Sequence, residues 1–188
     1  MKRNVTLIVV LMMVFTLGLV AGTCDVKKEK VKPADIDKGL KKYTNTKWNV
    51  LKKHSVTYAV SGNEKVDDFS RQSAVVYASF LQAEHTSDLT SKDMQKLKKD
   101  KDTKAKNEAQ DNLKIAQDVL LKASNAAPDL IKSGNELAAN YKDLIKDFSK
   151  APAIAEAMKN SISNLTQVVT ESPDLVKKLG KQVTALAD

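Results

Sequence analysis

The chain has 188 residues, of which 42% are hydrophobic and 29% charged, and its formal net charge is +8. This composition suits one globular domain with an appendage, and the small numbers of glycine (6) and proline (4) argue against an all-β domain, which needs many tight turns. Almost all of the positive charge comes from lysine, because arginine occurs only at Arg3 and Arg71, so sequence-specific recognition of nucleic acid is not expected.

The first 23 residues have the layout of a secretory signal peptide. Lys2 and Arg3 form a basic start, the 16 residues from Val5 to Val20 are mainly apolar, and residues 21–23 are small enough for a peptidase groove. The alternative is an uncleaved transmembrane helix, although the apolar stretch is shorter than the roughly 20 residues that cross a bilayer core. We therefore predict export and removal of residues 1–23.

The only cysteine, Cys24, follows this segment directly, and the run Val20-Ala21-Gly22-Thr23-Cys24 resembles the lipobox of bacterial lipoproteins. Family members usually carry Leu where this chain has Ala21, and Gly, Ala or Ser where it has Thr23. The resemblance implies a diacylglyceryl group on the Cys24 thiol, cleavage before it, and an N-acyl group such as palmitate on the new terminus. It also implies a lipid-anchored location in the bacterial cell envelope, facing the periplasm or exterior, with the inner or outer membrane left open. Without lipidation, Cys24 would be a free thiol on a tail.

Behind the anchor, the sequence predicts a short charged tether, 24–33, followed by a helical domain, 34–188. The lysines and acids of the tether favour an unfolded spacer, or alternatively attraction to anionic lipid headgroups. The fold class expected for the domain is all-α, an antiparallel bundle of about five or six amphipathic helices.

The first part of this domain predicts two helices. Apolar residues recur at helical spacing after Pro33, although 56–60 (VTYAV) would also suit a strand. Trp48 within this part fits a core position better than a membrane interface. The second helix has an apolar stripe and is expected to break at 86–91, where N-cap residues gather. The stripe consists of Val66, Phe69, Ser73, Val76 and Phe80.

Region 92–125 is helix-prone, with a lysine-rich first half and an apolar stripe in its second half. It predicts either one protruding helix or two helices with a frayed join. The lysines are candidate contacts for a polyanion or for lipid headgroups, whereas the alternative, a solvated helix face, is favoured for charge runs of this kind. The candidate residues are Lys96, Lys98, Lys99, Lys101, Lys104 and Lys106.

Three prolines, Pro128, Pro152 and Pro173, are each expected in the first turn of a short amphipathic helix. The apolar stripes behind them are predicted to form core, and they include Leu130, Leu137, Tyr141, Leu144, Phe148, Ile154, Met158, Ile162, Leu165, Val169, Leu175, Leu179, Val183 and Leu186. The proline spacing also resembles that of exchangeable apolipoproteins, whose helices coat lipid. This resemblance implies an alternative function, the binding or carriage of lipid or another apolar ligand.

Catalysis is not expected. The chain has two histidines, His54 and His85, and lacks a Gly-rich phosphate loop or a nucleophile elbow. Glu84, His85 and Asp88 could touch a metal from one helical turn, but no second histidine pairs with them, so no metal site and no cofactor beyond the acyl groups is predicted. The function expected is a lipid-anchored, non-catalytic structural or interaction module. Its partners would be the membrane and an unidentified envelope protein or lipid.

Overall fold

The computed structural model describes residues 26–32, 35, 36, 41, 48, 56–99, 103–145 and 147–187. The predictions for the signal segment, for Cys24, for His54 and for Lys101 lie outside these residues. Within them, the elements are β1 (Lys28–Lys30), β2 (Thr57–Ala59), α4 (Glu64–Lys99), α5 (Thr103–Ala139), α6 (Tyr141–Leu144), the 3₁₀ turn η2 (Phe148–Lys150) and α7 (Ala151–Ala187).

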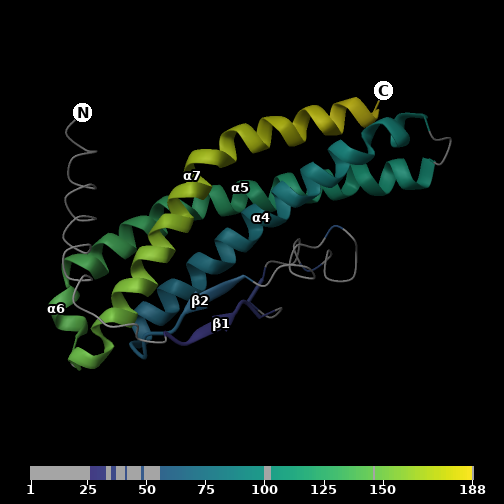
Figure 1. Cartoon of the computed structure of the whole chain (residues 1–188). Helices are drawn as coiled ribbons and strands as arrows, with labels where there is room; N and C mark the ends of the chain where they lie inside the picture. Colours follow the sequence, from purple (N-terminus) through teal and green to yellow (C-terminus); the bar gives the residue numbers. More distant parts are fainter. Residues whose placement is uncertain are drawn as a thin grey trace, which may run out of the picture.

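Three long helices, α4, α5 and α7, form the bundle, and each packs against the other two along the molecule (Figure 1). The predicted predominance of packed helices is therefore confirmed, but the fold is not purely α-helical, because β1 and β2 form a two-stranded sheet. The predicted number of five or six helices is not confirmed, because the described residues form these three long helices and the single turn α6. Helix α4 ends at Lys99 and α5 begins at Thr103, and the two helices pack against each other, so the two-helix alternative for region 92–125 is the correct one.

The prolines account for much of the difference in helix number. Pro152 lies in the first turn of α7 as predicted, but Pro128 lies inside α5 and Pro173 inside α7, so the prediction that these two begin helices is wrong. A proline inside a helix removes one backbone hydrogen bond and favours bending, and Figure 1 shows α7 changing direction along its length. The helix continues because apolar side chains on both sides of Pro173, including Leu165, Val168, Leu175 and Leu179, are buried in one core.

Helix α4 also runs through the expected break at 86–91. Its hydroxyl groups are satisfied inside the helix instead of capping a new one: Thr86 Oγ1 donates to the carbonyl of Gln82 at 2.8 Å, and Ser91 Oγ donates to that of Ser87 at 2.9 Å. The helix begins where Asn63 Oδ1 accepts the N–H of Lys65 at 3.1 Å, which is a side-chain N-cap.

The prediction of an unfolded spacer is wrong for residues 26–32, because β1 pairs antiparallel with β2. The register places Lys28 opposite Ala59 and Lys30 opposite Thr57, and the strand alternative for 56–60 is thereby confirmed. Trp48, with 2% of its surface exposed, joins Val31, Ile36 and Val56 in the core that these segments share with the helices, which contradicts a membrane-interface role for it.

The core contains most of the predicted stripe residues. Two exceptions lie on α7 and just before it: Val169 is 39% exposed, with Val168 buried in its place, and Phe148 is 86% exposed. The prediction that these two side chains belong to the core is wrong. Phe148 lies in η2, where the chain turns between α6 and α7, and none of the η2 residues is buried.

Candidate functional site

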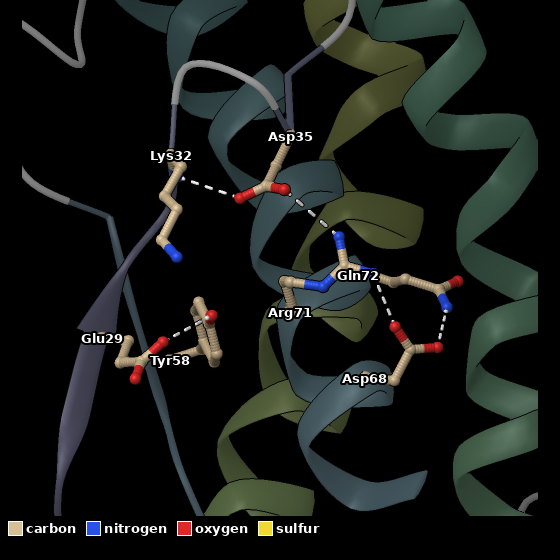
Figure 2. Close-up of polar contacts among 7 residues, drawn as sticks. All are labelled: Glu29, Lys32, Asp35, Tyr58, Asp68, Arg71 and Gln72. Atoms are coloured by element: carbon tan, nitrogen blue, oxygen red, sulfur yellow. Dashed lines mark hydrogen bonds and ion pairs between the residues drawn. The ribbon is translucent and has the colours of Figure 1, made fainter. Parts of the chain in front are cut away.

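Polar side chains fasten the two-stranded sheet to α4, and Arg71 lies at their centre (Figure 2). Arg71 donates from Nη2 to Asp68 Oδ1 at 2.5 Å and from Nη1 to Asp35 Oδ1 at 3.4 Å. Asp35 also accepts the backbone N–H of Lys32 at 3.1 Å, and Gln72 Nε2 donates to Asp68 Oδ2 at 2.6 Å. The guanidinium therefore ties the N-terminal segment to the helix, and we call Asp35, Asp68, Arg71 and Gln72 the arginine cluster.

The charges around this junction act on one another. The hydrogen bond from Arg71 lowers the pKa of Asp68, and the same contact raises the pKa of Arg71. Hydrogen bonds from Lys27 Nζ (3.1 Å) and from the Tyr58 hydroxyl (3.2 Å) lower the pKa of Glu29. Burial and then the bond to Glu29 raise the pKa of Tyr58. Such charge-assisted hydrogen bonds hold the N-terminal segment and α4 in a fixed arrangement.

The arginine cluster was not predicted, although the sequence contains one signal for it. Arg71 is the only arginine after residue 3 in a chain whose other cations are lysines. A planar guanidinium can bridge two carboxylates at once, which an ammonium group does less well. An isolated arginine of this kind therefore indicates a bridging contact, but its partner Asp35 is 36 residues away in the sequence and cannot be inferred from spacing.

The turn before α4 is tied to the turn after α5. Asp67 Oδ1 accepts both the N–H and the hydroxyl of Ser61 at 2.7 Å, and Asp67 Oδ2 accepts the N–H of Gly62 at 3.1 Å. Gly62 has φ +75, a left-handed conformation that favours glycine. Asn63 Nδ2 donates across to the carbonyl of Leu144 at 3.1 Å. Two connections that lie 81 residues apart are thus fixed at the same end of the bundle.

We call this the α6 end, defined by Val26, 61–63, 141–145, 147–150 and the first turn of α7. Val26, Leu144 and Ile145 pack against one small apolar cluster of buried residues, which comprises Ala59, Val66, Ile154, Ala157 and Met158. Lys28 Nζ lies 3.5 Å from Glu156 Oε1, which adds an ion pair between β1 and α7. The first described residue of the chain is therefore packed into the same end as the α6–α7 connection.

The surface of the α6 end carries one highly exposed aromatic ring and charged side chains of both signs. Phe148 projects there, and Lys142, Asp143, Asp147 and Lys150 are all exposed around it. Asp147 Oδ1 accepts the N–H of Ser149 at 3.0 Å, and its bonds to Ser149 lower the pKa of Asp147. The fixed N-cap holds the turn that presents Phe148.

The predicted lysine contacts lie at the opposite end of the bundle (Figure 1). Lys96, Lys98 and Lys99 are exposed in the last turn of α4, while Lys104 and Lys106 are in the first turn of α5. A helix of 36 residues is about 54 Å long, which separates these lysines from the α6 end. Cations in the last turn also complement the negative end of the helix dipole, so three of the lysines have a structural role in α4 itself.

Two hollows lie beside the sheet and the arginine cluster. An open groove of about 430 Å³ runs between α4 and α5, and it is lined by apolar Phe69, Leu130 and Leu137 together with polar side chains that include Asp68 and Gln72 of the arginine cluster. A smaller hollow of about 70 Å³ lies between β2, α4 and α7, where Ser161 Oγ donates to Ser70 Oγ at 3.2 Å. Neither hollow was predicted, because each is assembled from segments distant in sequence.

The Glu84, His85 and Asp88 group does not converge on a metal. Asp88 Oδ1 instead accepts from Lys178 Nζ of α7 at 2.9 Å. Among the described residues, no three His, Cys, Asp or Glu side chains lie together in an arrangement that could hold a metal ion. Glu84 is partly buried, and burial, followed by the charges of Asp88 and Glu171, raises its pKa.

This shift predicts a pH-dependent effect of Glu84→Gln. A raised pKa means that folding favours the protonated carboxyl, a contribution that is present below the unfolded value near 4.5 and is lost as pH rises through the folded pKa. Because solvent screens this partly exposed carboxyl, Glu84→Gln should stabilise the protein at pH 7 by no more than about 0.5 kcal/mol, and should lose this advantage in acid. The change in the free energy of unfolding is measured by urea denaturation at pH 7 and in acid. The charge-matched control is Glu108→Gln, because Glu108 is exposed. An advantage that persists unchanged in acid would contradict the assignment.

Comparisons with known proteins add no relative. The chain matches no family model, no curated protein and no solved structure. In the described ranges, none of the helices combines the length and the apolar character needed to cross a bilayer.

Proposed function

We propose that this chain is an exported lipoprotein, in which acyl groups on Cys24 hold a non-catalytic helical module at a membrane of the bacterial envelope. The observation that carries the proposal is the position of the only cysteine, directly behind a signal-like segment of 23 residues. Two or three acyl chains give stable attachment where a single chain is marginal.

In this proposal, the helical module functions through its attachment to the membrane. Attachment concentrates its surfaces at the membrane, where an envelope protein or lipid meets them at high effective concentration. The described charged groups support an interaction role more than a chemical one. Arg71 is bonded to Asp68 and Asp35, and Lys178 is bonded to Asp88, so these groups stabilise packing between segments. The acyl groups are the only covalent additions that the proposal requires.

Replacing Cys24 with serine tests the proposal. The full chain and Cys24→Ser are produced in a bacterial host fed a clickable fatty acid. We expect the wild-type protein to be labelled and to sediment with membranes, and the variant to be unlabelled, because serine cannot form the thioether. An unlabelled wild-type protein that washes out of the membrane fraction would contradict the proposal.

The second candidate function, binding of an apolar ligand, gains its support from the groove between α4 and α5. Its volume of about 430 Å³ is within the range of small-molecule sites, and Phe69, Leu130 and Leu137 give it an apolar wall. Native mass spectrometry of the full chain tests this candidate. A retained ligand that is lost on Leu137→Asp would favour carriage, whereas a consistently ligand-free chain would count against it.

A further inference from the structure

The position of Val26 limits where an anchor on Cys24 can be. Two peptide units separate these residues, so covalent geometry keeps their Cα atoms within about 7.6 Å of each other. Val26 is packed against the apolar cluster of the α6 end, and the carbonyl of the next residue, Lys27, accepts the N–H of Val60 at 2.8 Å. Whatever the path of those two units, acyl groups on Cys24 are tied to the α6 end.

The α6 end also carries the most exposed large apolar side chain of the described residues, Phe148. A single exposed apolar residue is ordinary on a protein surface and says little by itself. This one lies in the turn that Asp147 caps, beside the α6 segment whose Leu144 carbonyl accepts from Asn63. The aromatic ring is thus presented on the part of the surface that the anchor draws toward the bilayer.

From these two observations we propose that the α6 end is the membrane-facing surface of the protein, with the Phe148 ring inserted at the boundary between lipid headgroups and acyl chains. The inference rests on the proposed lipidation of Cys24. Aromatic and apolar side chains on membrane-bound proteins are buried at this depth. The α6 end therefore contacts a lipid bilayer. The short covalent connection between lipidated Cys24 and Val26 holds it there.

Charge plays a minor part in this contact. Among the residues of the α6 end that the structure describes, exposed Lys142 and Lys150 are accompanied by exposed Asp143 and Asp147, so these four charges balance. The lysine-rich end of α4 and α5 is about 54 Å away along α4. With the α6 end at the bilayer, those lysines lie far from the membrane. A soluble or polymeric polyanion is therefore favoured over lipid headgroups as their binding partner.

Tryptophan scanning of the full, lipidated chain tests the orientation. Phe148→Trp, Leu121→Trp and Lys98→Trp are each reconstituted into vesicles of phosphatidylethanolamine and phosphatidylglycerol, with or without brominated acyl chains. Leu121 is the matched control, an exposed apolar residue (43%) on the side of α5. Trp48 is buried and gives a common background, measured on the wild type and subtracted.

We expect the Phe148→Trp emission to shift to shorter wavelength on reconstitution and to lose intensity in brominated vesicles. Both effects should persist at high salt, because charge plays a minor part in the contact. Leu121→Trp and Lys98→Trp should keep their emission. Quenching at residue 98, or equal quenching at 148 and 121, would overturn the orientation. Fatty-acid labelling of the same samples separates the two proposals: a labelled protein with an unquenched residue 148 contradicts the orientation alone, whereas an unlabelled protein contradicts both.

Discussion

Gly134→Ala should destabilise the protein, whereas the same change at Gly180 should not. A Cβ atom on Gly134 of α5 would lie 2.5 Å from Cζ of Phe69 on α4 and 3.2 Å from Cγ1 of Ile162 on α7. Phe69 is 4% exposed and Ile162 8% exposed, so moving either side chain disturbs the packing between the helices. Overpacking of this kind costs about 1–3 kcal/mol, which exceeds the roughly 1 kcal/mol that alanine gains in helix propensity.

Gly180 is the matched control because it is also helical, but the nearest atom to its added Cβ is Gln117 Nε2 at 3.7 Å, an ordinary contact. Gly180→Ala should therefore stabilise the protein by up to about 1 kcal/mol. The measurement is the free energy of unfolding in urea. Equal effects of the two substitutions would show that α4, α5 and α7 do not approach one another at Gly134.

Gln182→Ala should be the most damaging change to a polar side chain in the interface between α4 and α7. Gln182 is 7% exposed, and its Nε2 donates to the carbonyl of Ser87 at 2.8 Å and to Ser91 Oγ at 2.7 Å. Its Oε1 accepts from Ser87 Oγ at 3.0 Å. Alanine would leave the buried hydroxyl and carbonyl groups of Ser87 without a partner on α7, at a cost of about 1–3 kcal/mol.

Gln167→Ala on the same helix is the control. Gln167 is partly exposed and accepts from the Tyr77 hydroxyl at 3.2 Å, so water can replace the lost contact. We expect this change to cost less than about 1 kcal/mol in the same urea melts. If Gln167→Ala costs as much as Gln182→Ala, the buried network around Ser87 does not hold α7 to α4 as described.

Helical periodicity predicted the bundle, because residues such as Val66, Phe69 and Phe80 recur on one face of α4. It failed at the helix boundaries for a physical reason. Pro128 and Pro173 are equally compatible with a first turn and with a helix interior whose packing offsets one lost hydrogen bond. The continuous spacing of Ala123, Ala127 and Gly134 across Pro128 is the signal that could have indicated one long helix.

The surface features were harder to predict than the core. The sequence places Phe148 in phase with the apolar stripe, and only the η2 turn after α6 puts its ring in solvent. β1 forms only because it pairs with β2, about 30 residues away in the sequence. The charged residues in 25–33 indicate an unfolded spacer and give no sign of this strand. The lysine run was visible in the sequence, but its distance from the α6 end follows from the length of α4 alone.

The most direct test of the account is the mass of the N-terminal tryptic peptide from the membrane-extracted protein. Cleavage after Lys27 releases a peptide of residues 24–27, and the account predicts that it begins at Cys24 and carries a diacylglyceryl group on sulfur, with or without an N-acyl group. A peptide that begins upstream of Cys24, or one with a free thiol and no added mass, would contradict it.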